Sequence, residues 1–593
     1  MALPYSMKLP QSFLQIATLL LLALGASAIA AEDRPNVIVV MTDDQGYGDM
    51  GHHGNPILRT PNLDAFARDA TTFPQFYVSP VCSPTRASLM TGRYHLRTGV
   101  VDTYKGRSMM HADETTLAEM LLDSGYETGI FGKWHLGDNY PMRPQDQGFQ
   151  NSLIHRGGGI GQFADPPNNS YFDPILFENG KEVKTKGYCT DVFTDAAVKF
   201  IYDNRRKPFF AYISYNAPHT PLQVPDEYYA KYKDKDLSPA QFPETGAPLR
   251  ANKNPDDIAR VYGMVENIDD NFGRLLAQLE KYKLRDNTIV IFLTDNGPQG
   301  PRFNAGLRDN KGSVFEGGIR VPFYIQWPAK LPKRKYGMIA AHIDIAPTVL
   351  DLCGVPVPNN VLFDGISLAP ILTLQPGQKL SWKDRTLHFQ WHRGDIPVKY
   401  RAFATRSQYF KLVQPTGRGN QKFTGGNAKY MLFDMRNDPY EQNNVAADFP
   451  EIVEEMKSRH ADWYDNMAST RGFEQPMIHL ATAKENPSTL TRQDWRGPEA
   501  TWDDFGKGHW DVIVPRDGSY HVTLRFPPTI QDDAIVRFQL GDYQKLEKVK
   551  KGVAEHTFKN IKMTATGGKL EAWVQQGEKV TGVHYVDVKR RIW

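Results

Sequence analysis

The chain has 593 residues, which is enough for several folding units and excludes a small single-module protein. Apolar residues make up 40% and charged residues 23%, the usage of folded globular proteins, which excludes a disordered chain. The 70 Lys and Arg against 67 Asp and Glu leave a formal net charge of +3, too small to indicate nucleic acid as a partner.

The first thirty residues have the composition of an export signal. Lys8 supplies a positive charge, residues 13–26 are almost all apolar, and small-residue cleavage sites end at Ala28 and Ala30. The apolar run is shorter than the roughly 20 residues that span a membrane, which argues against an N-terminal anchor. We therefore expect a cleaved signal peptide over residues 1–30 and a secreted or periplasmic mature protein without a membrane anchor.

Residues 31–375 alternate short apolar runs with helical patterns, which is typical of an α/β domain with a largely parallel sheet. Strands are predicted over 36–41, 209–214 and 288–293. Helices are predicted from Pro61, over 84–90, from Leu117 behind a capping box of Thr116 and Glu119, and over 258–279.

The pattern changes twice further along the chain. Residues 376–484 carry predicted strands over 386–391 and 402–413 and a helix over 450–463, which indicates a smaller α+β subdomain. In residues 485–593 apolar and polar residues alternate between DG and GG turns, which predicts an additional β-sandwich module.

The predicted sandwich is rich in tryptophan, with Trp495, Trp502, Trp510 and Trp573. These rings could stack on sugars, since aromatic faces do so well. We favour the alternative that most of them pack in the core or against the α/β domain, because Trp is highly buried on average.

Two pairs of oxygen-bearing side chains directly follow predicted strands. Asp43 and Asp44 follow the first strand, and Asp295 and Asn296 follow the strand over 288–293. Carboxyl ends of strands are where open α/β sheets bind ligands, and four oxygen donors suit Ca²⁺ or Mg²⁺ better than Zn²⁺. Each pair taken alone is more typical of a turn or a helix N-cap.

The chain has three cysteines. Cys82 lies at or just before the start of the helix predicted over 84–90, where free N–H groups favour anionic chemistry. From its position alone, a buried inert cysteine is the better interpretation. Cys189 and Cys353 either pair in an oxidising compartment or are separate buried residues.

The sequence CSPTR over residues 82–86, followed by TGR over 91–93, resembles the signature of the type I sulfatases, which are arylsulfatase-like enzymes. Further segments resemble the family in its order along the chain: 36–48, 132–137, 217–221, 294–297, 311–320 and 432–445. The resemblance implies an alkaline-phosphatase-like α/β fold, with a mixed, mostly parallel sheet flanked by helices.

The resemblance also implies the site residues. It assigns Ca²⁺ to Asp43, Asp44, Asp295, Asn296 and the residue at position 82, where a maturation enzyme oxidises Cys82 to formylglycine (3-oxoalanine). It assigns catalysis to Cys82, Arg86, Lys133, His135, His219 and Lys311, of which Lys133, His219 and Lys311 also bind substrate.

The residue types fit their tasks. A sulfate ester spreads negative charge over its oxygens, which a cation, an arginine fork and ammonium groups stabilise. By resemblance, a hydroxyl of hydrated formylglycine attacks sulfur, His219 and Lys311 protonate the departing oxygen, and His135 takes a proton from the second hydroxyl. Taken alone, either histidine is more typical of a structural residue.

Polar loop residues near these motifs are weaker candidates for substrate binding. His392 and Arg393 are candidates, as are His155 and Arg156 beside the glycine-rich segment 157–161, which we expect to be a loop bordering the pocket. The alternative is that they are simply solvated.

The sequence therefore predicts a secreted sulfatase that hydrolyses sulfate esters of carbohydrates or small aryl alcohols. One alternative is a phosphomonoester or phosphonate hydrolase of the same superfamily. The other is a catalytically silent carbohydrate-binding protein, which would have no need of a nucleophile precursor at Cys82.

Overall fold

The computed structural model describes residues 34–375, 377–378, 382, 384–503, 505–526 and 529–591. The predicted signal peptide over residues 1–30 lies outside these ranges. Within them, no helix combines the length and the apolar character needed to cross a membrane.

The α/β domain, predicted to be the catalytic domain, is built on one nine-stranded sheet in the order β2-β10-β9-β1-β8-β4-β5-β6-β7. The five central strands run parallel, and the strands at both edges are antiparallel to their neighbours. In sheet order the strands are β2 (Thr71–Thr72), β10 (Phe323–Gln326), β9 (Thr288–Thr294), β1 (Asn36–Thr42), β8 (Phe209–Ser214), β4 (Glu127–Lys133), β5 (Asn151–His155), β6 (Ile175–Glu178) and β7 (Lys181–Lys184).

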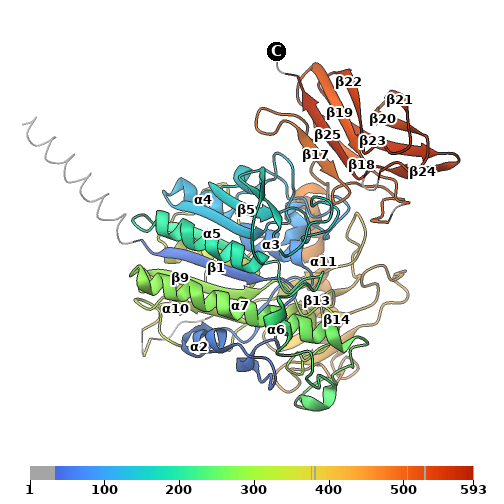
Figure 1. Ribbon diagram of the computed structural model, residues 1–593. Coiled ribbons are helices and arrows are strands. Elements are labelled where there is room, and N and C mark those ends of the chain that lie inside the picture. The colour runs from blue at the N-terminus through green and yellow to red at the C-terminus, as the bar shows by residue number, and fades with distance from the viewer. Residues whose placement is uncertain are drawn as a thin grey trace, which may run out of the picture.

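Helices cover both faces of this sheet (Figure 1). One face carries α2 (Pro61–Asp69), α5 (Cys189–Asp203) and α7 (Pro255–Lys281), and the other carries α3 (Cys82–Thr91), α4 (Leu117–Asp123), α9 (Ile345–Leu352) and α10 (Ala369–Leu372). Both predicted layers follow from β1, whose side chains alternate between the two cores: Val37 and Val39 face α3, whereas Ile38 and Val40 face α7. The predicted alkaline-phosphatase-like α/β class is confirmed.

Local signals in the sequence also set the helix ends. The predicted capping box is present, since Glu119 N donates to Thr116 Oγ1 at 3.1 Å and Thr116 N donates to Glu119 Oε2 at 2.8 Å. Two short helices, α6 (Asp226–Tyr229) and α8 (Glu316–Ile319), and a two-stranded sheet of β3 (Phe76–Tyr77) and β11 (Ala340–Ala341) complete the domain.

The three cysteines are free and buried. Cys189 lies in the core on the α5 face of the sheet and Cys353 in the core on the opposite face. The disulfide considered from the sequence is therefore wrong, because the sheet separates the two thiols.

A four-stranded antiparallel sheet follows the catalytic domain, formed by β12 (Leu387–Gln390), β13 (Phe403–Arg406), β14 (Phe410–Gln414) and β15 (Met431–Asp434). The single strand predicted over 402–413 is wrong: it is a hairpin that turns at Ser407, whose N–H donates to Phe410 O at 2.9 Å. The turn contains no Gly or Pro, so the sequence did not mark it. The helix predicted over 450–463 is α11 (Pro450–Arg471), which ends at left-handed Gly472.

The last part of the chain forms two sheets around one shared core, at the end of the molecule drawn in red in Figure 1. One sheet contains β16 (Ile478–His479), β18 (His509–Val514), β23 (Thr566–Gln576), β20 (Ala534–Leu540), β21 (Tyr543–Val549) and β24 (Lys579–Gly582). The other contains β17 (Ser488–Thr491), β25 (Tyr585–Arg590), β19 (Gly518–Arg525) and β22 (Glu555–Met563). All pairings are antiparallel except β16 with β18. The boundaries at 375 and 484 stay a prediction.

Two of the four tryptophans named from the sequence lie in the core of this terminal module, and a third packs against the α/β domain. Trp495 and Trp510 are 0% exposed and lie in the sandwich core. Trp502 packs edge-on against Tyr104 of the catalytic domain, with ring centroids 4.9 Å apart. The core of the module also contains Met109 and Met142, which precede it by more than 300 residues. The module and the catalytic domain therefore share apolar packing.

We expect a chain of residues 31–484 to be less stable than the mature chain of residues 31–593. Removing the module uncovers the apolar surface around Met109, Met142 and Tyr104. Thermal unfolding and size-exclusion chromatography should show a melting temperature at least about 5 °C lower, or aggregation. A stable monomer with an unchanged melting temperature would mean that the interface contributes little.

Candidate active site

The predicted metal-binding residues meet at the carboxyl edge of the central sheet. Asp43 and Asp44 follow β1, and Asp295 and Asn296 follow β9, the strand paired with it in parallel. Asp44 N donates to Asp295 Oδ1 at 3.2 Å, and Asn296 Nδ2 donates to Asp44 Oδ1 at 2.8 Å. Asp44 adopts a left-handed backbone conformation with φ of 65°, a costly state for a non-glycine residue that turns its side chain into the cluster.

Three cationic side chains neutralise this acidic cluster. Lys133, the last residue of β4, places Nζ 2.5 Å from Asp43 Oδ2, and Arg86 of α3 places Nη2 2.7 Å from Asp295 Oδ2. Lys311 Nζ lies 2.5 Å from Asp44 Oδ1. Arg86 and Lys133 have fully buried side chains, whereas the Lys311 side chain is 15% exposed. The cluster is therefore more accessible to solvent on the Lys311 side.

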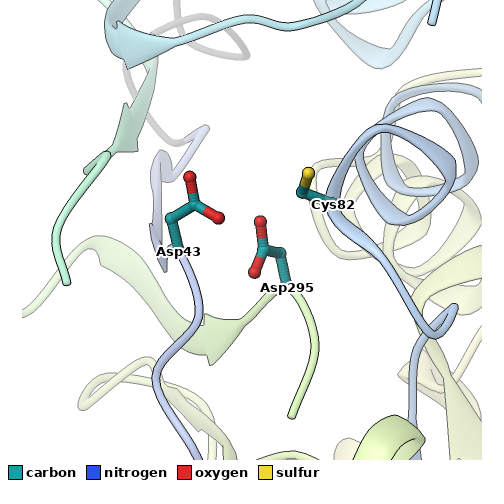
Figure 2. Close-up of side chains that lie close together, drawn as sticks. All are labelled: Asp43, Cys82 and Asp295. Carbon is teal, nitrogen blue, oxygen red and sulfur yellow. The ribbon is translucent and has the colours of Figure 1, made fainter. Parts of the chain in front are cut away.

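Three buried oxygens of the cluster have no hydrogen-bond partner among the described residues: Asp43 Oδ1, Asp44 Oδ2 and Asn296 Oδ1. Such oxygens are costly unless a ligand satisfies them. Oxygens of Asp43 and Asp295 and Cys82 Sγ also lie within 4.8 Å of one another, and Figure 2 shows the two carboxylates side by side with Cys82 facing them. This donor set fits a hard divalent cation.

The pKa shifts of the carboxylates agree with the binding of a divalent cation at this cluster. Burial and the charge of Asp43 raise the pKa of Asp295 to about 7. Burial also opposes ionisation of Asp43, but the Lys133 ammonium and its neighbours outweigh burial and lower the pKa of Asp43. A cation would stabilise both carboxylates in their ionised form.

Cys82 is the first residue of α3 and is 2% exposed. Burial raises the pKa of its thiol, so the unmodified side chain is a poor nucleophile at neutral pH. Its Sγ lies 3.5 Å from His135 Nδ1. Any reactive group at position 82 therefore faces both this histidine and the acidic cluster.

The hydrogen bonds of His135 define its tautomer. Its Nε2–H donates to the Thr103 carbonyl at 2.7 Å, because a carbonyl only accepts. Burial lowers the pKa of His135 well below its ordinary value, which keeps the ring neutral. The Nδ1 lone pair therefore points at position 82, the arrangement of a base.

His219 lies on the open side of the cluster, with Nε2 3.8 Å from Asp44 Oδ2 and a side chain that is 12% exposed. Its Nδ1–H donates to the Thr220 carbonyl at 2.6 Å. Burial lowers its pKa, although the charges of Asp43 and Asp44 act in the opposite direction. His219 and Lys311 together form the rim of the pocket.

The glycine-rich segment over 157–161 lies against both histidines, as expected from the sequence. A Cβ on Gly158 would lie 3.0 Å from His135 Cε1, and one on Gly159 would lie 3.3 Å from His219 Nδ1. Side chains at these positions would press on the rings, so glycine permits the close approach.

The four weaker candidates for substrate binding, His155, Arg156, His392 and Arg393, differ in the contacts that they make. His392 uses both ring nitrogens on backbone groups, donating to Arg393 O and accepting from Val398 N, so both nitrogens are engaged within the protein; substrate binding by His392 stays a prediction. His155 is fully buried, with Nδ1 bonded to Arg156 O, and the Arg156 guanidinium lies over the Phe177 ring at 4.2 Å.

Arg393 lies beside the segment that bonds to His135. It places Nη1 2.5 Å from Asp102 Oδ1 and 2.9 Å from Thr103 Oγ1. The Thr103 carbonyl is the acceptor of His135, so Arg393 holds the segment on which that histidine depends.

Sequence reasoning missed three polar residues of this region. Ser214, whose Oγ accepts from Arg86, ends the predicted strand over 209–214 and could have been found by the strand-end rule. Thr103 and Gln493 both contact His135 and carried no signal, since one acts through a backbone carbonyl and the other comes from the terminal module.

Two family profiles match the chain: one described as Sulfatase over residues 35–355, and one described as N-sulphoglucosamine sulphohydrolase, C-terminal, over residues 306–465. Arylsulfatase A of Homo sapiens is 30% identical over 496 residues, covering 74% of this chain and 89% of its own. N-acetylgalactosamine-6-sulfatase of Canis lupus familiaris is 30% identical over 412 residues, covering 64% and 72%.

Among solved structures, the crystal structure of Ps i-CgsB in complex with k-i-k-neocarrahexaose is 30% identical, with a TM-score of 0.60. The match covers 75% of this chain and 94% of that one. Neither family profile extends past residue 465, so both end before the terminal module.

We expect Asp44→Asn and Asp295→Asn to weaken divalent-metal binding by more than about tenfold, because each variant removes one charge from the donor set. Titration calorimetry and metal analysis of dialysed protein measure this. Asp165→Asn is the matched control, since Asp165 is equally buried but its carboxylate accepts from the loop groups Arg156 N, Gly161 N and Asn169 Nδ2. Unchanged metal content in both variants would remove these residues from the metal site.

Proposed function

This chain belongs to the sulfatase family of sulfuric ester hydrolases, and from that premise we propose that it is an exported, Ca²⁺-dependent carbohydrate sulfatase that acts through formylglycine made from Cys82. The observation that carries the proposal is the position of Cys82. It lies beside two metal-binding carboxylates and 3.5 Å from the Nδ1 lone pair of a neutral histidine.

Sulfatases generally use a formylglycine and a divalent metal. The buried Cys82 thiol, with its raised pKa, is not itself a good nucleophile, and it stands in the motif that the maturation enzyme would modify. Hydrated formylglycine would supply the hydroxyl nucleophile, and Ca²⁺ held by Asp43, Asp44, Asp295 and Asn296 would supply positive charge beside it.

The residues of the pocket balance charge for an anionic substrate. The three carboxylates of Asp43, Asp44 and Asp295 face three cations, Arg86, Lys133 and Lys311. A divalent metal would leave the cluster with a net charge of about +2, which complements a sulfate ester and favours the more anionic transition state. The intact set of Cys82, Arg86 and both histidines supports a catalyst rather than a silent binding protein.

Proton transfer falls to the two histidines and Lys311. His135 directs its Nδ1 lone pair at position 82 and so would accept a proton from that residue. His219 and Lys311 lie beside Asp44 on the more exposed side of the cluster and would bind the oxygen of the departing alcohol. The Lys311 ammonium carries a proton to donate, whereas His219 would donate only after it is protonated on Nε2, because its Nδ1–H is bonded to the Thr220 carbonyl.

Carbohydrate sulfates are the proposed substrates. Relatives named for N-acetylgalactosamine 6-sulfate hydrolysis and a 30% identical structure with a bound neocarrahexaose support this class. The apolar, signal-like first thirty residues support export, and the maturation enzyme would be a partner during synthesis.

Sulfate release from a panel of sulfated oligosaccharides and an aryl sulfate tests the function, with a phosphate monoester as the competing substrate. We expect sulfate release, aldehyde at position 82 by peptide mass spectrometry, and a loss of at least about 10³-fold in kcat for Cys82→Ala.

Cys189→Ala is the matched control, because Cys189 is also a buried free thiol but is the first residue of α5 and lies in the core on that face of the sheet. It should keep its activity. Active protein that carries only unmodified Cys82, or faster turnover of the phosphate ester than of every sulfate ester, would contradict the proposal. Preparations made without the maturation enzyme are excluded from this comparison.

A further inference from the structure

Gln493 belongs to the terminal module, but its side chain lies at the wall of the active site. It follows β17 by two residues and is 1% exposed. Its amide Nε2 donates to the Thr103 carbonyl at 2.9 Å and to Ser108 Oγ at 3.2 Å, and it lies 3.3 Å from His135 Nε2. Both amide hydrogens therefore have acceptors on the catalytic domain.

The Thr103 carbonyl is shared between Gln493 and His135. A carbonyl oxygen has two lone pairs, and here one accepts from His135 Nε2–H at 2.7 Å and the other from Gln493 Nε2–H. This oxygen holds His135 in the Nε2–H tautomer. A displacement of Thr103 that breaks the bond would therefore remove the preference for a proton on Nε2.

Backbone contacts hold the same segment against the module. Gly106 N donates to the Gln493 carbonyl at 3.0 Å, and Gly106 has a left-handed backbone with φ of 67°. A Cβ at Gly106 would lie only 2.8 Å from Asp494 O. Residues 103–106 therefore lie close along the Gln493 segment, and side-chain and backbone bonds reinforce each other.

We propose that Gln493 is a positioning residue for the catalytic base: it holds the Thr103 carbonyl so that His135 keeps its Nε2–H tautomer and presents its Nδ1 lone pair to position 82. The role of His135 as base rests on the proposed function. By this inference the terminal module completes the active site of the catalytic domain.

Without the Gln493 amide, the Thr103 carbonyl loses one of its two buried hydrogen bonds, and the segment loses its contact with the module. The Nδ1–H tautomer of His135 then competes. That tautomer places a proton between the ring and residue 82, where it cannot accept another.

The test compares Gln493→Met with Tyr585→Phe in the full mature chain. Methionine keeps the length of the side chain but cannot donate. Tyr585→Phe removes a different bond between the module and the catalytic domain, from Tyr585 Oη to Asp165 O at 2.6 Å, and has no contact with Thr103 or His135. Melting temperature, aldehyde content at position 82, kcat and KM are measured for each.

We expect Gln493→Met to lower kcat by about tenfold or more with KM within about twofold, at an aldehyde content equal to that of the wild type. Tyr585→Phe should keep the kcat of the wild type, although it lowers the melting temperature by as much as Gln493→Met does. NMR of ¹⁵N-histidine-labelled protein, with the His135 signals assigned from His135→Gln, should show loss of the Nε2–H tautomer in Gln493→Met alone.

An unchanged tautomer and a kcat within about twofold of the wild type would overturn the inference, as would equal losses of kcat in both variants, which indicate a merely structural contact. Should Gln493→Met not fold, Gln493→Asn replaces it, because that amide is one methylene too short to reach Thr103. The tautomer is read without substrate, so a failure of the proposed reaction and a failure of this inference are distinguishable.

Discussion

Electrostatic repulsion among buried carboxylates is the constraint on which the rest of the site depends. Parallel pairing of β1 with β9 places Asp43, Asp44 and Asp295 at one sheet edge with almost no contact with water. Like charges in a buried site raise each other's pKa, as Asp295 shows. The surrounding cations, Arg86, Lys133 and Lys311, reduce this repulsion, and three unpartnered oxygens leave a place for a cation to complete the compensation.

That arrangement requires an unusual backbone around it. Asp44 and His135 both have left-handed conformations, with φ of 65° and 60°. A Cβ on Gly297, next to Asn296, would lie 1.8 Å from Gly317 O, so no other residue fits there. A strained or glycine-dependent backbone conformation persists only when the surrounding structure fixes it, and here the two packed cores, one on each face of the sheet, do so.

The features of the fold and the site that could be predicted are those whose signal in the sequence is local. The strands over 36–41, 209–214 and 288–293 and the capping box at Thr116 are local patterns, and they were predicted correctly. The convergence of the acidic pairs followed from one rule about strand ends. The β13–β14 hairpin was missed because its turn at Ser407 lacks Gly and Pro, and the hydrogen bonds of the His392 ring were not foreseen because its partners are backbone atoms that composition does not reveal.

The contact between Gln493 and His135 could not be predicted in this way, because no local sequence pattern indicates it. The two residues are 358 positions apart and meet where the terminal module packs against the α/β domain. Docking is tight because Met109 and Met142 of the catalytic domain enter the core of the module. Residues 103–108, which hold the acceptor of the catalytic histidine, therefore lie against a surface that the module supplies. If Gln493 positions Thr103 as proposed, a change in the packing of the module reaches the proton position on His135 through two hydrogen bonds to one carbonyl.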